Sequence, residues 1–185
     1  MKKTIIIDAC STSLSGGLTY LKEFLNNSTN EYAYFEIICS HEIAKKLPIS
    51  SNIRLINHPF LNKGIFHRLI FQFFFIDKFI NKEAHVLISL NGDYTGNFRP
   101  FIGVCQNMLL YEEEKTLGMS TLEKFKFKLL RQRQIRSFNK SKGVIFLSRH
   151  ASKIVLPLIK TKNNEIINFG ISDRFKNEQR RAERI

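Results

Sequence analysis

The sequence has no tryptophan, few cysteines and no long apolar run that is free of charge. Its three cysteines, Cys10, Cys39 and Cys105, are odd in number, lie far apart and form no CxxC pair. This pattern argues against a disulfide framework and indicates a reduced, cytoplasmic protein. We expect each thiol to pack as a small buried apolar group, and we expect no metal site and no cofactor.

Targeting signals are also absent from the visible sequence. The apolar run after Lys3 stops at Asp8 and is too short for a signal peptide. No stretch is long and uncharged enough to span a bilayer. The 185 residues are enough for one sizeable domain and not comfortably for two.

Acidic residues are scarce as well, with 16 Asp and Glu against 29 Lys and Arg, which gives a net charge of +13. Such an excess of positive charge implies an anionic partner. A nucleic acid, an anionic membrane surface and a phosphorylated substrate all satisfy that condition, and charge alone does not choose among them.

Short apolar runs alternate with segments of helical periodicity along the whole chain. This alternation predicts an α/β fold, a Rossmann-like parallel sheet with helices on both faces. The expected strands are 4–7, 34–39, 53–56, 84–90, 101–105, 143–147 and 165–168, and the main expected helices start near residue 18 or span 41–46, 64–81, 119–139 and 151–159.

A polar loop with paired glycines follows the first expected strand. Ser15, Gly16 and Gly17 stand where the next helix begins. Glycines at a helix start let the backbone approach a ligand, and the free N–H groups there favour phosphate. The loop is not a GxGxxG motif, so a tight turn that needs glycine for its backbone angles remains an equal alternative.

Side-chain amides follow two other expected strands. Gln106 and Asn107 come directly after 101–105, and Asn91 comes after 84–90. The carboxyl ends of parallel strands are where open α/β sheets bind ligands, so these amides are candidates for a binding cleft. The alternative is that they only cap turns, as Asn often does.

Two helices carry strong composition signals. The segment 64–81 is very apolar, and we expect it to pack on the sheet, with membrane or partner contact as the alternative. Nearly all the charged side chains of the segment 119–139 are cations, which indicates an anionic surface nearby. On the first helix one wide apolar face contains Phe66, Leu69, Ile70, Phe73, Phe74 and Ile80, and a second contains Phe71, Phe75 and Phe79. On the second helix the residues that can face inward are Leu122, Phe125, Leu129, Leu130 and Ile135.

Four local patterns occur in an order that resembles one enzyme family. They are Ser15-Gly16-Gly17, AHVLISLNGDY at 84–94, GVCQNMLLYE at 103–112, and IFLSRHA at 145–151 paired with INFGISDRF at 167–175. Together they make the chain similar to the N-terminal domain of a GT-B glycosyltransferase of the large retaining family 4.

The resemblance implies a Rossmann-like acceptor-side domain over 1–172, with 173–185 as a charged tail or the start of an interdomain linker. The donor-phosphate loop would be Ser15, Gly16 and Gly17. The acceptor cleft would contain Asn91, Gln106, Asn107, Ser148 and Arg149. No residue is assigned to catalysis, because many relatives carry His where this chain has Gln106 or Asn107.

The implied function is the acceptor-binding half of a glycosyltransferase that moves a sugar from a nucleotide-sugar donor to a glycan or lipid-linked acceptor in cell-surface polysaccharide synthesis. The donor domain, with its pair of glutamates, is not in this sequence. We therefore expect a truncated or split enzyme that is inactive alone, cytoplasmic and in peripheral contact with an anionic membrane at its inner face.

Two alternatives stay open. One is a basic nucleic-acid-binding module, although the aromatic residues are not interleaved with Lys and Arg and no RRM, KH or zinc pattern is present. The other is a non-catalytic subunit of a split transferase.

Overall fold

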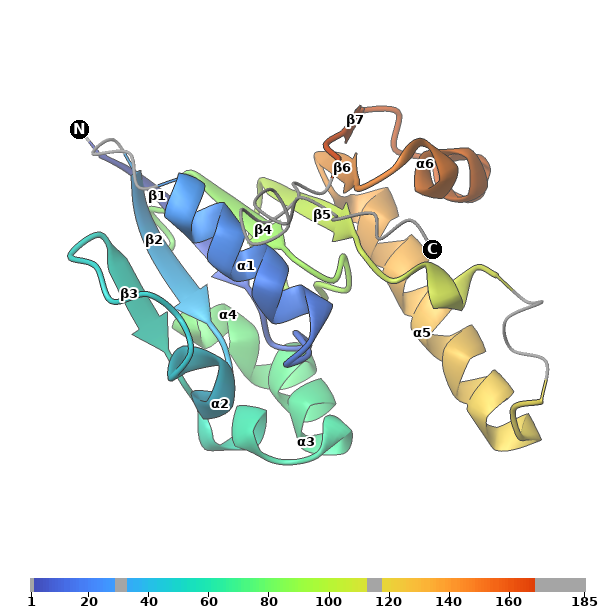
Figure 1. The fold of residues 1–185 in the computed structure, drawn as a ribbon, viewed down its shortest axis with the longest axis horizontal. Helices are drawn as coiled ribbons and strands as arrows, with labels where there is room; N and C mark the ends of the chain where they lie inside the picture. The colour runs from blue at the N-terminus through green and yellow to red at the C-terminus, as the bar shows by residue number, and fades with distance from the viewer. Residues whose placement is uncertain (1, 29–32, 113–117, 169–185) are drawn as a thin grey trace, which may run out of the picture.

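The computed structural model describes residues 2–28, 33–112 and 118–168 and contains one seven-stranded sheet in which every neighbouring pair is parallel. The strand order is β3-β2-β1-β4-β5-β6-β7 (Figure 1). The expected Rossmann-like parallel sheet is therefore confirmed. The strands are β1 (Lys3–Asp8), β2 (Ala33–Ile38), β3 (Ile53–Ile56), β4 (Val86–Ser89), β5 (Phe101–Cys105), β6 (Gly143–Phe146) and β7 (Asn164–Ile166).

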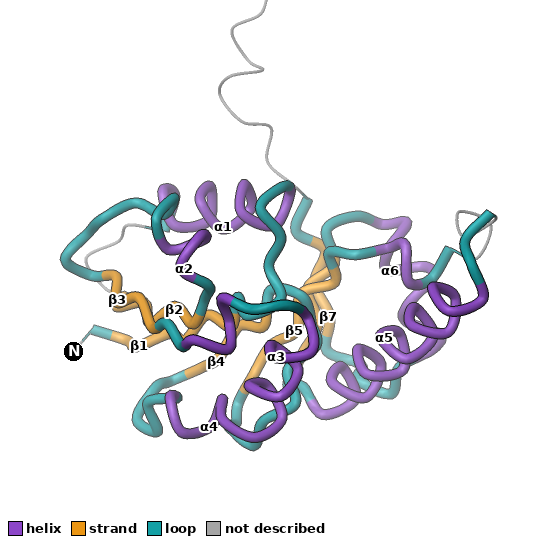
Figure 2. The backbone as a smooth tube through the Cα atoms, turned by 90° about the horizontal axis from the view of Figure 1, so that it is seen from below, coloured by secondary structure: helices purple, strands orange, loops and turns teal. Residues whose placement is uncertain are grey.

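Helices connect the strands and cover both faces of the sheet, with α1 and α2 on one face and α3 and α4 on the other (Figure 2). The helices are α1 (Gly16–Asn27), α2 (His41–Ala44), α3 (Ile65–Ile70), α4 (Ile76–Phe79), α5 (Thr121–Lys140) and α6 (Arg149–Val155). Short 3-10 turns span Pro59–Asn62, Met108–Leu110 and Leu156–Leu158. Helices are required on both faces because a parallel sheet is apolar on each of them.

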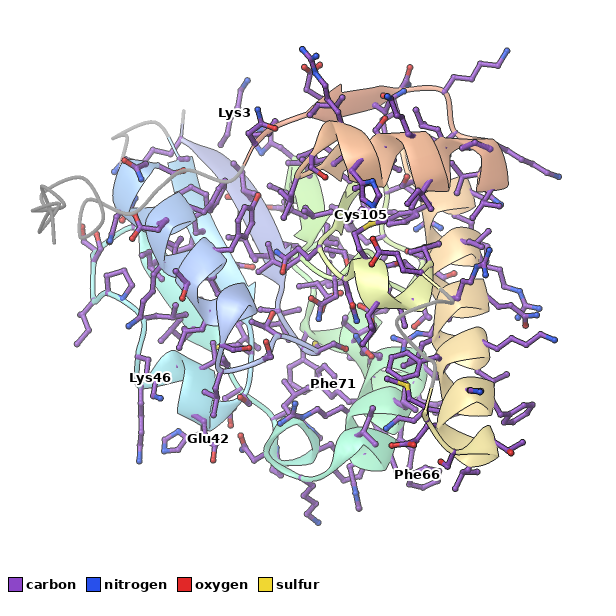
Figure 3. The ribbon with its side chains drawn as sticks, turned by 45° about the vertical axis from the view of Figure 1, so that its right-hand side comes forward. Lys3, Glu42, Lys46, Phe66, Phe71 and Cys105 are labelled. Carbon is purple, nitrogen blue, oxygen red and sulfur yellow. The ribbon has the colours of Figure 1, made fainter. Side chains whose placement is uncertain are left out.

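The apolar segment between β3 and β4 is helical as expected, and its two apolar faces differ in burial. A π-helical turn, Phe71–Phe75, joins α3 to α4. Such a turn forms i→i+5 hydrogen bonds, so side chains after it are rotated relative to an uninterrupted α-helix. Phe71 and Ile76 are buried, whereas Phe66, Phe73 and Phe74 are 68%, 57% and 73% exposed. Figure 3 shows Phe71 in the interior and Phe66 at the periphery.

Helix α5 packs on the sheet only near its C-terminal end. Its buried residues are Gln134, Ser137 and Phe138. The N-terminal half of the helix extends away from the sheet (Figure 1), and Leu122, Phe125 and Leu129 there are exposed. The expectation that these three face inward is wrong, because no other described element covers that half of the helix.

Phe138 anchors the C-terminal half of α5 against two glycines. A Cβ atom on Gly92 would collide with the Phe138 ring, and a Cβ atom on Gly103 would lie 2.8 Å from it. Phe138 is fully buried. The absence of side chains at Gly92, after β4, and at Gly103, in β5, therefore makes the space that this ring occupies.

Two further expectations concern membrane-spanning segments and the C-terminal tail. No helix in the described ranges has the length and apolarity needed to cross a bilayer. The expected charged tail, 173–185, lies outside the described residues.

Candidate functional site

A cavity of about 470 Å³ opens at the carboxyl ends of β1, β4 and β5. The strand order reverses between β1 and β4, which is the point where open α/β sheets bind ligands. The loop after β1, the start of α1, the loops after β4 and β5, the α3 segment and α5 all contribute walls. The lining residues are Ser11, Ser13, Ser15, Gly16, Gly17, Ile65, Arg68, Leu69, Gln72, Asn91, Asp93, Gln106, Asn107, Leu110, Leu130, Arg133 and Gln134.

The structure brings six of the eight predicted site residues into this one cavity, which we call the polar cavity. They are Ser15, Gly16, Gly17, Asn91, Gln106 and Asn107. Ser148 and Arg149 are not among its lining residues. The Ser148 Oγ accepts a hydrogen bond of 3.1 Å from the Ala151 N–H at the start of α6, and Arg149 is exposed. Their place in an acceptor cleft stays a prediction.

The two glycines of the loop have different surroundings. A Cβ atom on Gly16 would meet no atom within 4 Å, whereas one on Gly17 would lie 3.0 Å from Thr12 Cγ2. Neither glycine has a positive φ, since among the described residues only Gly92 and Gly118 do. The backbone angles therefore do not explain the pair. Gly17 allows close packing of the loop, and Gly16 leaves the start of α1 open.

The amides after β5 also differ from each other. The Asn107 Oδ1 accepts a hydrogen bond of 3.1 Å from the Leu109 N–H and so caps the following 3-10 turn. The capping alternative thus holds for Asn107. Gln106 Nε2 is buried and has no hydrogen-bond partner among the described residues, which leaves a donor without an acceptor beside the polar cavity.

A network of four side chains forms the floor of the polar cavity. Arg133 Nη2 lies 3.2 Å from Asp93 Oδ2 and also donates to the Gln72 Oε1. The Ser11 Oγ donates to Asp93 Oδ2 over 3.0 Å. Gln72 is 1% exposed. The network joins the loop after β1, the π-turn, the loop after β4 and α5.

Little in the sequence indicates this network. Gln72 is the one polar residue in the run FQFFF, which could have marked it as a buried polar group with a partner. Arg133 is one of many cations on α5, and nothing nearby in the sequence distinguishes it from a solvated charge. Its ion pair with Asp93 spans 40 positions, which no local pattern reveals.

Asp8 lies below this floor at the end of β1 and is 2% exposed. It accepts hydrogen bonds from the Ser89 Oγ over 3.1 Å and from the Cys10 N–H over 3.2 Å. Burial, with a further contribution from the negative charge of Asp93, raises the pKa of Asp8 to about 6. Its carboxyl group can therefore change protonation state under mildly acidic conditions.

The three cysteines are free and buried, as expected. Burial raises the pKa of the Cys39 and Cys105 thiols to about 12, and it raises that of Cys10 as well. Thiols with such pKa values are not nucleophiles at neutral pH. Within the described ranges, no group of three or more His, Cys, Asp or Glu side chains is arranged to hold a metal ion.

Comparison with known proteins identifies structures of similar fold but no sequence family. No family model and no curated protein matches the sequence. Among solved structures, UGT2 of Phytolacca americana, complexed with UDP-2fluoro-glucose and pterostilbene, aligns over 95% of this chain with 12% identity and a TM-score of 0.57. UGT71G1 of Medicago truncatula, complexed with UDP-glucose, aligns over 91% of it with 13% identity and a TM-score of 0.52.

The fold matches one half of a GT-B glycosyltransferase. This chain covers 56% of the Phytolacca chain and 51% of the Medicago chain, so it spans about half the length of these glycosyltransferases. At 12% and 13% identity the likeness concerns the fold, and function has to be argued from the residues of the site.

Proposed function

We propose that this chain is the acceptor-binding N-terminal half of a glycosyltransferase. The reaction would move a sugar from a nucleotide-sugar donor to a glycan or lipid-linked acceptor, and the family 4 resemblance extends the proposal to cell-surface polysaccharide synthesis. The donor would be held with a second domain, supplied by a longer form of this protein or by another chain.

The observation that carries the proposal is the shared cavity. Residues from three separate patterns of the sequence, Ser15-Gly16-Gly17, Asn91 and the pair Gln106-Asn107, line one space at the switch point of the sheet. The open start of α1 at Gly16 suits the phosphates of a donor that approaches from a second domain. The amides and the Asp93 carboxylate suit the hydroxyl groups of an acceptor, because sugars need both donors and acceptors.

We further propose peripheral contact with an anionic membrane on the cytoplasmic side. Exposed apolar side chains of α3, the π-turn and α5 include Phe66, Phe74, Leu122 and Phe125. Exposed lysines such as Lys124 and Lys128 lie on the same helix as the last two. Apolar side chains surrounded by cations are the combination that binds anionic bilayers.

The first experiment measures what the full chain binds. A panel of oligosaccharides is titrated into the isotope-labelled chain, and NMR shift changes are recorded, with and without UDP-glucose. We expect sugar binding that shifts the resonances of the polar cavity and no sugar transfer by the chain alone. Gln106→Ala should weaken sugar binding at least tenfold, since it removes a hydrogen-bond donor of the polar cavity. Asn27→Ala, at the other end of α1 from the loop, should not weaken it.

The same protein tests the nucleic-acid alternative. If no glycan in the panel binds while single-stranded RNA binds with an affinity that falls steeply with salt, the chain is a nucleic-acid-binding module and the proposal is wrong. A slope that corresponds to several phosphates would be the signature of such binding.

A further inference from the structure

A second cavity, of about 480 Å³, lies between the π-turn and α5, and we call it the helix groove. Leu69, Phe73, Leu129 and Leu130 provide apolar walls. Arg136 and Lys140, both exposed, add positive charge along the α5 side. The helix groove is therefore largely apolar, with cationic side chains along α5.

The helix groove adjoins the polar cavity. Leu69, Leu130 and Arg133 line both spaces, so the two share a wall and meet at Arg133. The guanidinium of Arg133 lies 5.4 Å from the centre of the Phe73 ring on the groove side and pairs with Asp93 on the cavity side. A ligand that passes this arginine would contact polar groups at one end and apolar groups at the other.

Residues that line the polar cavity also carry unmatched donors. Gln72 Nε2, Gln106 Nε2 and Arg133 Nε are buried and have no hydrogen-bond partner within the described part of the chain. All three are N–H groups, and each such group buried without an acceptor is unfavourable. This side of the polar cavity is therefore rich in donors and short of acceptors, which favours an occupant that carries hydroxyl or phosphate oxygens.

Apolar surface continues outward from the helix groove. Phe73 and Leu129, at its mouth, are 57% and 52% exposed. A purely polar glycan gains nothing from such walls, and a flat bilayer contact does not require an apolar groove next to a polar cavity. A single hydrocarbon chain attached to a polar head satisfies both features.

We infer that the acceptor is an amphiphile whose hydroxyl-bearing head occupies the polar cavity, whose anionic linkage lies by Arg133 and Arg136, and whose hydrocarbon chain occupies the helix groove. This inference rests on the proposed acceptor-binding function and selects a lipid-linked acceptor over a free glycan. The occupant is one lipid molecule and not the membrane surface.

The test uses alkyl phosphates with chains of 4, 8 and 12 carbons, kept below their micelle-forming concentrations, and inorganic phosphate as the reference. Affinity for the full chain is measured by calorimetry. We expect each added methylene to tighten binding by about fourfold until the groove is filled, in line with the free energy of burying a methylene. Alkyl trimethylammonium ions of the same length should bind at least tenfold more weakly.

Matched variants separate the groove from the outer surface. Leu129→Ser should reduce the chain-length dependence, whereas Phe125→Ser, one turn earlier on α5 and outside the groove, should not. Likewise Arg136→Gln should reduce the preference for phosphate, and Lys124→Gln should not. All four residues are exposed, so the variants should fold.

Each possible result is decisive. Affinity that is independent of chain length, or an equal loss in Leu129→Ser and Phe125→Ser, overturns the inference, and the latter result would indicate contact with a membrane surface. If chain length has no effect while free oligosaccharides still bind, the inference fails and the acceptor-binding function stands. If alkyl phosphates bind as expected while neither free oligosaccharides nor alkyl glycosides bind, the groove is real and the proposed function is wrong.

Discussion

Arg133 Nη2 of α5 lies 3.2 Å from Asp93 Oδ2, and the two side chains are only 10% and 14% exposed. Burying both charges is costly, and their attraction offsets that cost only while both partners are present. The pair fixes the loop after β4 to α5 and thereby shapes the floor of the polar cavity.

Replacement of Arg133 by Met should lower the free energy of unfolding by about 3 kcal/mol, because Asp93 would keep a buried charge without its cation. Urea unfolding followed by circular dichroism measures the loss. Lys128→Met, at an exposed position of the same helix, is the control and should change stability by less than about 0.5 kcal/mol.

A double-mutant cycle completes that test. Asp93→Asn combined with Arg133→Met should be less destabilised than the sum of the single changes, since the second substitution removes the unpaired charge. Strict additivity would contradict a direct interaction between the two side chains.

The buried Asp8 predicts a distinctive dependence of stability on pH. Its pKa is raised from 3.8 to about 6 in the folded state, so the folded chain binds the proton more tightly than the unfolded chain does. The contribution to stability is therefore fully present below about pH 4 and is lost as pH rises through 6. A shift of this size corresponds to about 3 kcal/mol.

Asp8→Asn should remove this dependence. We expect the free energy of unfolding of the variant, relative to that of the natural chain, to increase by about 3 kcal/mol between pH 4 and pH 8, because only the natural chain loses stability over this range. Other ionisable groups are common to both proteins and cancel in the difference. A difference that stays constant across this range would show that the pKa of Asp8 is not raised.

Gly92 offers a test of close packing. Gly92→Ala should destabilise the chain by about 3 kcal/mol or more, because a Cβ atom would collide with the Phe138 ring and lie 3.0 Å from the Val104 carbonyl oxygen. Gly118 also has a positive φ but has no atom within 4 Å of such a Cβ. Gly118→Ala should therefore cost only the backbone strain, about 1 kcal/mol.

Thermal unfolding of both variants separates the two effects. Equal losses of stability in the two variants would mean that backbone strain alone, without the clash, explains the effect of Gly92→Ala. Truncation of the ring in Gly92→Ala/Phe138→Leu should recover part of the loss, since the clash is with the ring, and no recovery would contradict the proposed packing.

The sheet and much of the polar cavity follow from the sequence for a physical reason. β3 and β5 have the predicted bounds, because a parallel strand buried on both faces must be a short apolar run. Once strands and helices alternate, the carboxyl ends of the strands share one edge, and this is why Gln106 and Asn91 lie beside Gly16.

The faces of the two long helical segments could not be predicted in the same way. Periodicity shows that Phe73 and Leu129 belong to apolar stripes and does not show whether a neighbouring element covers them. The π-turn changes the rotation of residues after Phe71, and no residue type marks its position. Arg133 was missed because its partners, Gln72 and Asp93, come from distant parts of the chain.

Phe138 also has a consequence for ligand selection. Because its ring packs on Gly92 and Gly103, the position of helix α5 along the sheet is set by this contact, and with it the positions of Arg133 and Leu129. These two residues lie four positions, or roughly 6 Å, apart along the helix axis. A ligand that occupies both cavities would therefore meet the Arg133 cation and the Leu129 side chain at a set spacing along α5.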